Sequence, residues 1–269
     1  MNASVMASGQ RVWGLMYRHL ALFRRSWPRL LELAYWPVLQ MCIWGFTSSF
    51  LATRQGSPAA LAGGALIGGV LLWEVSLRSQ MGMSITFLEE IWSRNLGHVF
   101  VSPLRPFELV AALIGMSAIR MFAGVIPAAL LAWALYAFNV FAMGPVILLF
   151  FLNLMVMGWV VALAVISLIL RHGAGAEALA WSVLFGLTPF AAVFYPVSVL
   201  PLPLQWVAFI VPASHVFEGM RAALGGVIAW DQLALAVGMN VLWLAGAAWI
   251  FRRQFQVART RGALMTIGE

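Results

Sequence analysis

The chain has 269 residues, of which 63% are hydrophobic and 9% are charged, and its mean hydropathy is +0.93. A soluble domain of this length could not bury so much apolar surface, so the composition excludes ordinary soluble folds and predicts a membrane protein with several spans. The net charge of +7 comes from 16 basic residues, all arginine, which stand mainly at the ends of apolar runs and therefore indicate membrane topology rather than nucleic-acid binding.

The absence of lysine excludes two kinds of site. A P-loop needs a lysine that reaches the nucleotide phosphates, so the chain cannot carry that ATPase motif, and Schiff-base chemistry is excluded too. The single cysteine, Cys42, lies in an apolar run, so no disulfide within the chain is possible. The N-terminus lacks a short apolar region with a small-residue cleavage site, and we expect no removable signal peptide.

The N-terminal stretch predicts an amphipathic helix at residues 8–28 that lies on the membrane surface. Arg11, Arg18 and Arg25 are seven residues apart and share one face, beside an apolar face. A flexible basic tail is the alternative. We expect Pro28 to end this helix, and residues 1–29 to form an N-terminal element of their own.

Six apolar runs follow, each long enough to cross roughly 30 Å of hydrocarbon as a helix. The expected spans cover residues 30–51, 59–84, 107–138, 146–170, 177–195 and 231–251. The predicted fold is therefore an all-α membrane domain over residues 30–251, followed by a basic tail at 252–269.

The long polar interruption at residues 85–108 has a helical pattern, and we expect a helix at about 86–100. Its apolar positions recur at three- and four-residue spacing: Leu88, Ile91, Trp92, Asn95, Leu96 and Val99. Glu89, Glu90 and Arg94 occupy the other side. Nothing in the loop itself can bury the apolar edge, so this segment is predicted to dock against a partner.

The region at residues 196–224 is apolar but broken by prolines. Pro196, Pro201, Pro203 and Pro212 interrupt it. A broken backbone at membrane depth is tolerated only where it is buried in protein or lines a cavity. We therefore expect two short helices, at about 204–211 and 214–224, which form a re-entrant hairpin on the outer side.

Six spans place both termini on one side, and the arginines indicate that this side is the cytoplasm. Outer segments then carry only Arg54 and Arg221. Inner segments carry Arg11, Arg18, Arg24, Arg25, Arg29, Arg78, Arg94, Arg105, Arg171, Arg252, Arg253, Arg259 and Arg261.

Charged residues inside apolar runs are functional candidates, because an unpaired charge there is costly. Glu74 and Arg78 are one helical turn apart, which favours a structural ion pair over a gating or substrate contact. Arg120 lies deep in the third span, where it can bind an anionic headgroup or pair with a carboxylate of another helix. Glu218 and Arg221 are three apart and can lock the broken region.

The aromatic residues near the broken region have two readings, a belt at the membrane interface or a hydrophobic exit gate. This set includes Phe194, Tyr195 and Trp206. The histidines show no metal-binding spacing, so no metal site is expected. There is no GxSxG motif and no histidine inside an apolar span, which argues against an intramembrane enzyme.

Taken together, this order of elements resembles the permease subunit of type-2 ABC exporters over essentially the whole chain. The most specific pieces are the run from Glu89-Glu90 through Arg94-Asn95 to Glu108, and the late run with Leu200-Pro201, Pro212, Glu218 and Arg221. The resemblance implies that residues 1–29 form a cytoplasmic connecting helix, that 86–100 form a coupling helix, and that 196–224 form an extracellular gate.

The resemblance also implies site residues. Those expected to couple to an ATPase are Glu89, Glu90, Ile91, Trp92, Arg94 and Asn95. Those expected in the substrate path or gate are Arg120, Phe194, Tyr195, Trp206, Glu218 and Arg221. Gly97 and His98 depart from the expected coupling helix and can shorten or kink it.

By the same resemblance the chain is a non-catalytic permease in the bacterial cytoplasmic membrane, binds no cofactor itself, and leaves ATP and Mg to a separate ATPase subunit. Its expected partners are that ATPase, a second copy or a homologous permease, and membrane lipids, but no nucleic acid. The expected cargo is amphiphilic: a lipid-linked glycan, a lipid or a hydrophobic drug. An ion or small-solute channel is the alternative function.

Overall fold

The computed structural model describes residues 2–55, 57–97, 104–138 and 144–260, and every regular element among them is helical. The elements, in chain order, are α1 (Asn2–Arg24), α2 (Trp27–Gln55), α3 (Ser57–Trp92), α5 (Pro106–Tyr136), α6 (Val146–His172), η2 (Gly173–Ala176), α7 (Leu179–Leu187), η3 (Thr188–Phe190), η4 (Val197–Val199), α8 (Leu202–Ile210), α9 (Pro212–Leu224) and α10 (Trp230–Thr260).

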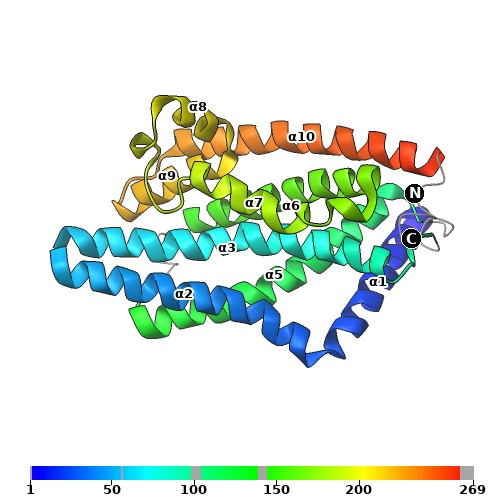
Figure 1. Cartoon of the computed structure of the whole chain (residues 1–269), viewed down its shortest axis with the longest axis horizontal. Coiled ribbons are helices and arrows are strands. Elements are labelled where there is room, and N and C mark those ends of the chain that lie inside the picture. Colours follow the sequence, from blue (N-terminus) through cyan, green and yellow to red (C-terminus); the bar gives the residue numbers. More distant parts are fainter. Residues whose placement is uncertain (1, 56, 98–103, 139–143, 261–269) are drawn as a thin grey trace.

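The long helices α2, α3, α5, α6 and α10 form a bundle with α3 at its centre (Figure 1). Helix α1 and the C-terminal end of α10 lie toward one end of the molecule, and α8 and α9 lie at the other. Three described helices, α5, α6 and α10, are long and apolar enough to cross a membrane, or four spans if the bent pair α8 and α9 counts as one. The chain is thus an all-helical, multi-pass membrane protein.

Helix α3 packs closely against α5 and α6. A Cβ atom at Gly158 of α6 would lie 2.6 Å from the carbonyl oxygen of Ser76, so glycine permits the contact between these helices. The hydroxyl of Ser76 donates to the carbonyl oxygen of Leu154 at 2.7 Å, and that of Ser117 donates to the carbonyl oxygen of Ser79 at 2.6 Å. Small residues and interhelical hydrogen bonds of this kind hold membrane helices together.

The boundaries confirm several predicted helices. The third and fourth expected spans correspond to α5 and α6, and the two short helices of the broken region correspond to α8 and α9, which meet at an angle of 97°. The last helix, α10, runs to Thr260 and includes part of the expected basic tail.

Two expected elements are wrong in extent. The N-terminal helix ends at Arg24, and Pro28 stands instead in the first turn of α2, where its fixed φ and missing N–H are tolerated. In place of a continuous span at 177–195 there is a nine-residue α7, continued by η3 up to Phe190. Pro189 stands in η3, where the α-helix gives way to 3-10 geometry.

The expected separate helix at 86–100 is also different. Residues up to Trp92 belong to α3, which has 36 residues and is roughly 54 Å long. The chain then turns at Arg94, whose φ of 52° is in the left-handed region, so the break comes before Gly97. His98 and Val99 lie outside the described residues.

Candidate functional site

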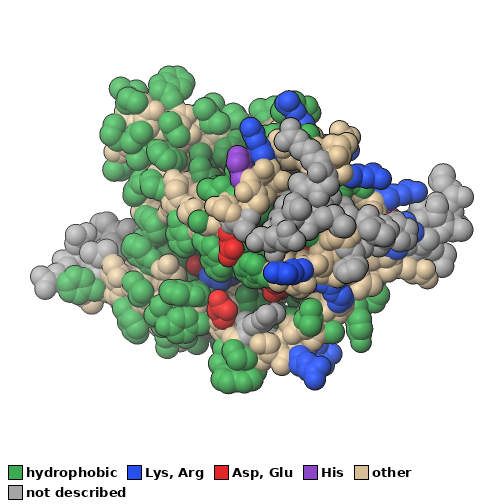
Figure 2. Space-filling model, turned by 45° about the vertical axis from the view of Figure 1, so that its right-hand side comes forward, with side chains coloured by type: hydrophobic (Ala, Val, Ile, Leu, Met, Phe, Trp, Pro, Cys, Tyr) green, Lys and Arg blue, Asp and Glu red, His purple; other side chains and the backbone are tan. Residues whose placement is uncertain are grey.

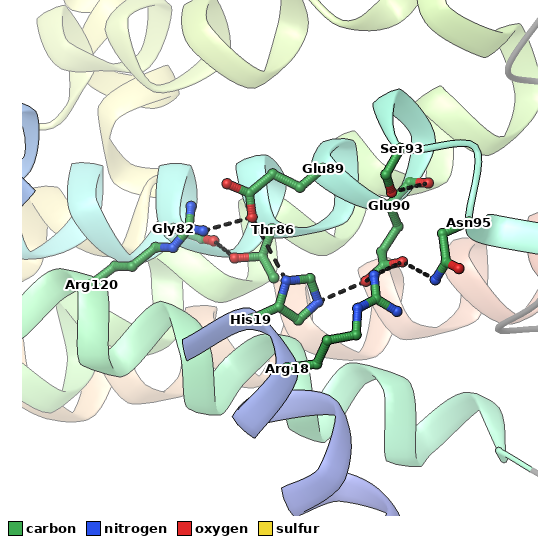
Figure 3. Close-up of polar contacts among 9 residues, drawn as sticks. All are labelled: Arg18, His19, Gly82, Thr86, Glu89, Glu90, Ser93, Asn95 and Arg120. Carbon is green, nitrogen blue, oxygen red and sulfur yellow. Dashed lines mark hydrogen bonds and ion pairs between the residues drawn. The ribbon is translucent and has the colours of Figure 1, made fainter. Parts of the chain in front are cut away.

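A cluster of charged residues joins α1 to the end of α3 and to α5 (Figure 3). Glu90, on the last turns of α3, is fully buried. One guanidinium nitrogen of Arg18 lies 2.7 Å from both of its carboxylate oxygens, Nε2 of His19 lies 2.8 Å from Oε1, and the Asn95 amide donates to Oε2 at 2.8 Å. Burial alone would raise the pKa of Glu90, but hydrogen bonds from His19, Asn95 and Arg18 outweigh it and lower the pKa to about 2.

His19 lies between two carboxylates. Only 3% of the residue is exposed, and its Nδ1 lies 3.7 Å from an oxygen of Glu89 while Nε2 faces Glu90. Burial lowers the pKa of His19, but the attraction of the Glu89 and Glu90 carboxylates outweighs burial, so the pKa is raised above its ordinary value. The site therefore favours the imidazolium form.

Glu89 connects the same cluster to α5. Its Oε2 lies 2.7 Å from a guanidinium nitrogen of Arg120. The guanidinium carbon of Arg120 also lies 5.4 Å from the centre of the Phe23 ring of α1, within cation–π range. Arg120 thus forms the expected pair with a carboxylate of another helix. Three helices thus meet around Glu89, Glu90, His19 and Arg120.

Helix α1 makes a second charged contact with the start of α5. Arg11 donates to Glu108 through Nε at 3.0 Å and through a terminal nitrogen, and the Ser8 hydroxyl donates to Glu108 at 2.6 Å. The backbone N–H of Arg105 donates to the same carboxylate at 2.9 Å. Arg11 and Arg18 therefore contact carboxylates of the chain itself, while Arg25 is exposed.

The apolar edge of the 85–108 segment is not open to a partner, which corrects the premise of its docking prediction. Leu88, Ile91 and Leu96 are 0%, 5% and 3% exposed, packed into the core of the same chain. The exposed part is the turn that follows. There Trp92 is half exposed and donates from Nε1 to Glu177 at 3.2 Å, and Ser93 and Arg94 are exposed. Among the residues expected to couple, Glu89, Glu90, Ile91 and Asn95 point into the chain, and Trp92 and Arg94 face outward.

A cavity of about 490 Å³ lies beside this cluster. It is bounded mainly by α2, α3 and α7, with Arg120 of α5 and Phe23 of α1 at its wall. Glu74 and Arg78 line it too, and Nε of Arg78 donates to Glu74 at 3.0 Å, which confirms the expected ion pair. The space-filling view shows arginine side chains mainly over the end that carries α1, and mostly hydrophobic side chains over the opposite end (Figure 2).

At that opposite end, α9 holds the irregular chain between η3 and α8. Glu218 accepts a hydrogen bond from the Val197 backbone N–H at 2.7 Å, and Arg221 donates to the carbonyl oxygen of Ala192 at 2.8 Å. Arg221 also pairs with Glu218 at 3.1 Å, which confirms the expected contact between them. Ala192 has φ 58°, so this bracing stabilises a strained turn.

The expected gate aromatics do not form one cluster. Phe194 stacks on Trp44 of α2, with ring centres 4.5 Å apart, and the Tyr195 hydroxyl donates to the carbonyl oxygen of Pro189 at 2.9 Å. Trp206 of α8 is 71% exposed. Phe194 is thus part of a packed aromatic contact, whereas Trp206 points outward.

Sequence reasoning missed the roles of His19 and Glu108 in fastening α1. A signal was present: three carboxylates at the ends of apolar helices need cations, and the nearest arginine-rich segment is α1. Across the described residues no group of histidine, cysteine and acidic side chains is arranged to hold a metal ion.

Comparison with known proteins gives one family. Residues 10–224 match the family described as ABC-2 type transporter. No curated protein matches the chain. The matched range includes α5 to α9 completely, together with most of α1, all of α2 and α3, and the charged cluster between them. The chain therefore belongs to the ABC-2 type transporter family and is a membrane permease of an ABC transporter.

Proposed function

We propose that this permease is the membrane subunit of an ATP-driven exporter in the bacterial cytoplasmic membrane. Two copies of the chain, or this chain and a homologous permease, work with two separate ATPase subunits. The family supports this role. The absence of lysine supports a separate ATPase subunit, because a chain without lysine cannot form a P-loop. ATP and Mg are then held by the ATPase subunits.

The proposed orientation has six spans and both termini in the cytoplasm. The spans are α2, α3, α5, α6, the segment from α7 to η3, and α10, with the α8–α9 hairpin on the outer side. The arginines near α1, at the inner end in this arrangement, support it through the positive-inside rule.

The observation that carries the proposal is the exposed turn at Trp92 and Arg94, which directly follows two glutamates that are bound to α1 and α5. Glu90 is fixed by Arg18 and His19 of α1, and Glu89 is fixed by Arg120 of α5. A force that the ATPase applies to the turn would act directly on α3, because α3 is one helix from Ser57 to Trp92. Closure of the ATPase dimer would thus move α1, α3 and α5 together.

The cargo in this proposal is amphiphilic: a lipid-linked glycan, a lipid or a hydrophobic drug. It enters the cavity beside the charged cluster from the inner leaflet. At the other end, the chain braced by Glu218 and Arg221 forms the outer gate.

The test is co-expression with an ABC ATPase subunit from the same organism. Trp92→Ala and Arg94→Ala are expected to reduce recovery of the ATPase in a pull-down and to lower its stimulated ATP hydrolysis. Matched controls are Trp249→Ala and Arg259→Ala, two exposed positions on α10. If the Trp92 and Arg94 variants assemble and stimulate hydrolysis as the parent chain does, the assignment of the turn is wrong. Ionic currents from the purified chain without ATPase would instead indicate a channel.

A further inference from the structure

The cavity beside the charged cluster has the size of a small-molecule site. Its volume of about 490 Å³ lies within the range of roughly 300–1,000 Å³ that is usual for such pockets. Most of its wall is apolar, and its polar groups are few and charged. The signs of those charges decide which ligands fit.

Five charged side chains line the cavity: Glu32, Glu74, Arg78, Glu89 and Arg120. Four of them are paired inside the chain. Arg78 lies 3.0 Å from Glu74, and Arg120 lies 2.7 Å from Glu89. Each pair is close to neutral as a unit.

Glu32 is different. It lies on the first turns of α2, is exposed, and forms no hydrogen bond or ion pair within the described part of the chain. The cavity wall therefore carries one negative charge that no arginine of the wall neutralises. Such a wall attracts cations and repels anions.

The apolar part of the wall also suits a cation. Five aromatic rings line the cavity: Phe23, Trp36, Trp92, Trp181 and Phe185. The Phe23 ring already lies 5.4 Å from the guanidinium of Arg120, so one cation–π contact is present in this wall. Trp36, Trp181 and Phe185 are each between 40% and 54% exposed, so a ligand has access to them.

We infer that this cavity binds a hydrophobic cation, with the positive group beside Glu32 and the apolar body among Trp36, Trp181 and Phe185. The inference rests on the proposed export function and narrows its cargo to amphiphiles with a positive charge. An anionic headgroup would have to displace a carboxylate from Arg78 or Arg120 and would also face Glu32.

The test uses two probe ions of nearly equal size and shape but opposite charge, tetraphenylphosphonium and tetraphenylborate. The full chain is placed in nanodiscs of zwitterionic lipid, binding is measured by equilibrium dialysis, and binding to empty nanodiscs is subtracted. Saturable binding of tetraphenylphosphonium, and much weaker binding of tetraphenylborate, is the expected result.

Glu32→Gln is expected to weaken phosphonium binding by about fivefold or more, since it removes the charge while keeping the shape. Glu32→Asp is expected to retain most of the affinity. Asp231→Asn removes an exposed carboxylate at the start of α10, outside the cavity lining, and is expected to bind as the parent chain does. All variants are first compared by size-exclusion chromatography.

Equal saturable binding of the two ions, or unchanged phosphonium affinity in Glu32→Gln, would overturn the inference. The assay needs no ATPase, so its result is independent of the coupling test. A chain that assembles with the ATPase but shows no preference for the cation refutes the cationic cargo alone. A chain that prefers the cation but never assembles with the ATPase refutes the exporter and leaves the binding site standing.

Discussion

Arg18 of α1 and Glu90 of α3 are 72 positions apart in the sequence, yet one guanidinium nitrogen of Arg18 lies 2.7 Å from both carboxylate oxygens of Glu90. The carboxylate is fully buried, whereas the Arg18 side chain is 39% exposed. Arg18 therefore reaches in from the surface to neutralise a charge that α3 could not bury alone. This contact fastens the N-terminal helix to the central helix of the bundle.

Glu90→Gln is predicted to loosen this attachment. The substitution keeps the shape but removes the charge that Arg18 and His19 face, and hydrogen bonds to charged groups contribute about 1.5–3 kcal/mol. Because Arg18 is partly solvated, we expect a loss of about 1–2 kcal/mol in the free energy of unfolding. In detergent this corresponds to a fall of a few degrees in the apparent midpoint temperature, roughly 2–4 °C per kcal/mol.

The control is Glu177→Gln, which removes a partly exposed carboxylate that accepts one hydrogen bond from Trp92. It is expected to change the midpoint much less than Glu90→Gln. Equal shifts of the midpoint in the two variants would show that the buried contacts of Glu90 contribute no more to stability than the exposed contact of Glu177.

The attachment of α1 is also predicted to depend on pH. The pKa of Glu90 is lowered from 4.5 to about 2, so its contribution is present above 4.5 and is lost as the pH falls toward 2. The pKa of His19 is raised above 6.5, so its contribution is present below 6.5 and is lost as the pH rises through the raised value. Both contributions are complete only between 4.5 and 6.5, and α1 should be held most firmly there.

A spin label reports this directly. With Cys42→Ser removing the only cysteine, Tyr17→Cys places a label on an exposed position of α1. Its mobility, read from the electron paramagnetic resonance line shape, should increase as the pH rises above the window. The other charged groups around His19 are Arg18, Glu89, Glu90 and Arg120. The increase should vanish in His19→Gln, and its persistence there would exclude histidine as the cause.

The sequence predicted the long helices well because their signal is local. Apolar runs of sufficient length and prolines near their ends locate α5 and α6 to within about two residues. The charged site has no such local signal in the sequence. Glu89 and Glu90 stand on what the periodicity marks as a polar face, and only the tertiary fold brings Arg18, His19 and Arg120 to them. A pattern that assigns charged residues to solvent cannot anticipate partners that are 31 to 72 positions away.

Gly158 gives a similar lesson for packing. It stands four residues before Ala162, which is a small-xxx-small spacing, but this spacing does not tell which helix packs there. Gly158→Ala is predicted to destabilise the bundle, because the new Cβ would lie 2.6 Å from the Ser76 carbonyl oxygen and 2.7 Å from Cβ of Ser79. Overpacking of this kind costs about 1–3 kcal/mol. Gly246→Ala, on α10, meets no atom within 4 Å and should leave the midpoint unchanged or higher; equal falls in both variants would contradict the packing argument.

Finally, the proposed orientation predicts which side of the membrane each turn faces. In the Cys42→Ser background, Ser93→Cys and Ser198→Cys place single thiols on exposed positions, one after α3 and one in η4. If only α5, α6, α10 and the bent pair α8–α9 crossed the membrane, two spans would separate Ser93 from Ser198 and both would face the same side. In the six-span arrangement the segment from α7 to η3 is a third span between them, so Ser93 is inside and Ser198 is outside. A membrane-impermeant maleimide added to intact spheroplasts should therefore label Ser198→Cys at once and Ser93→Cys only after permeabilisation. Labelling of both thiols in intact cells would rule out the six-span arrangement, and the reverse pattern would invert the orientation and remove Trp92 and Arg94 from the reach of any cytoplasmic ATPase.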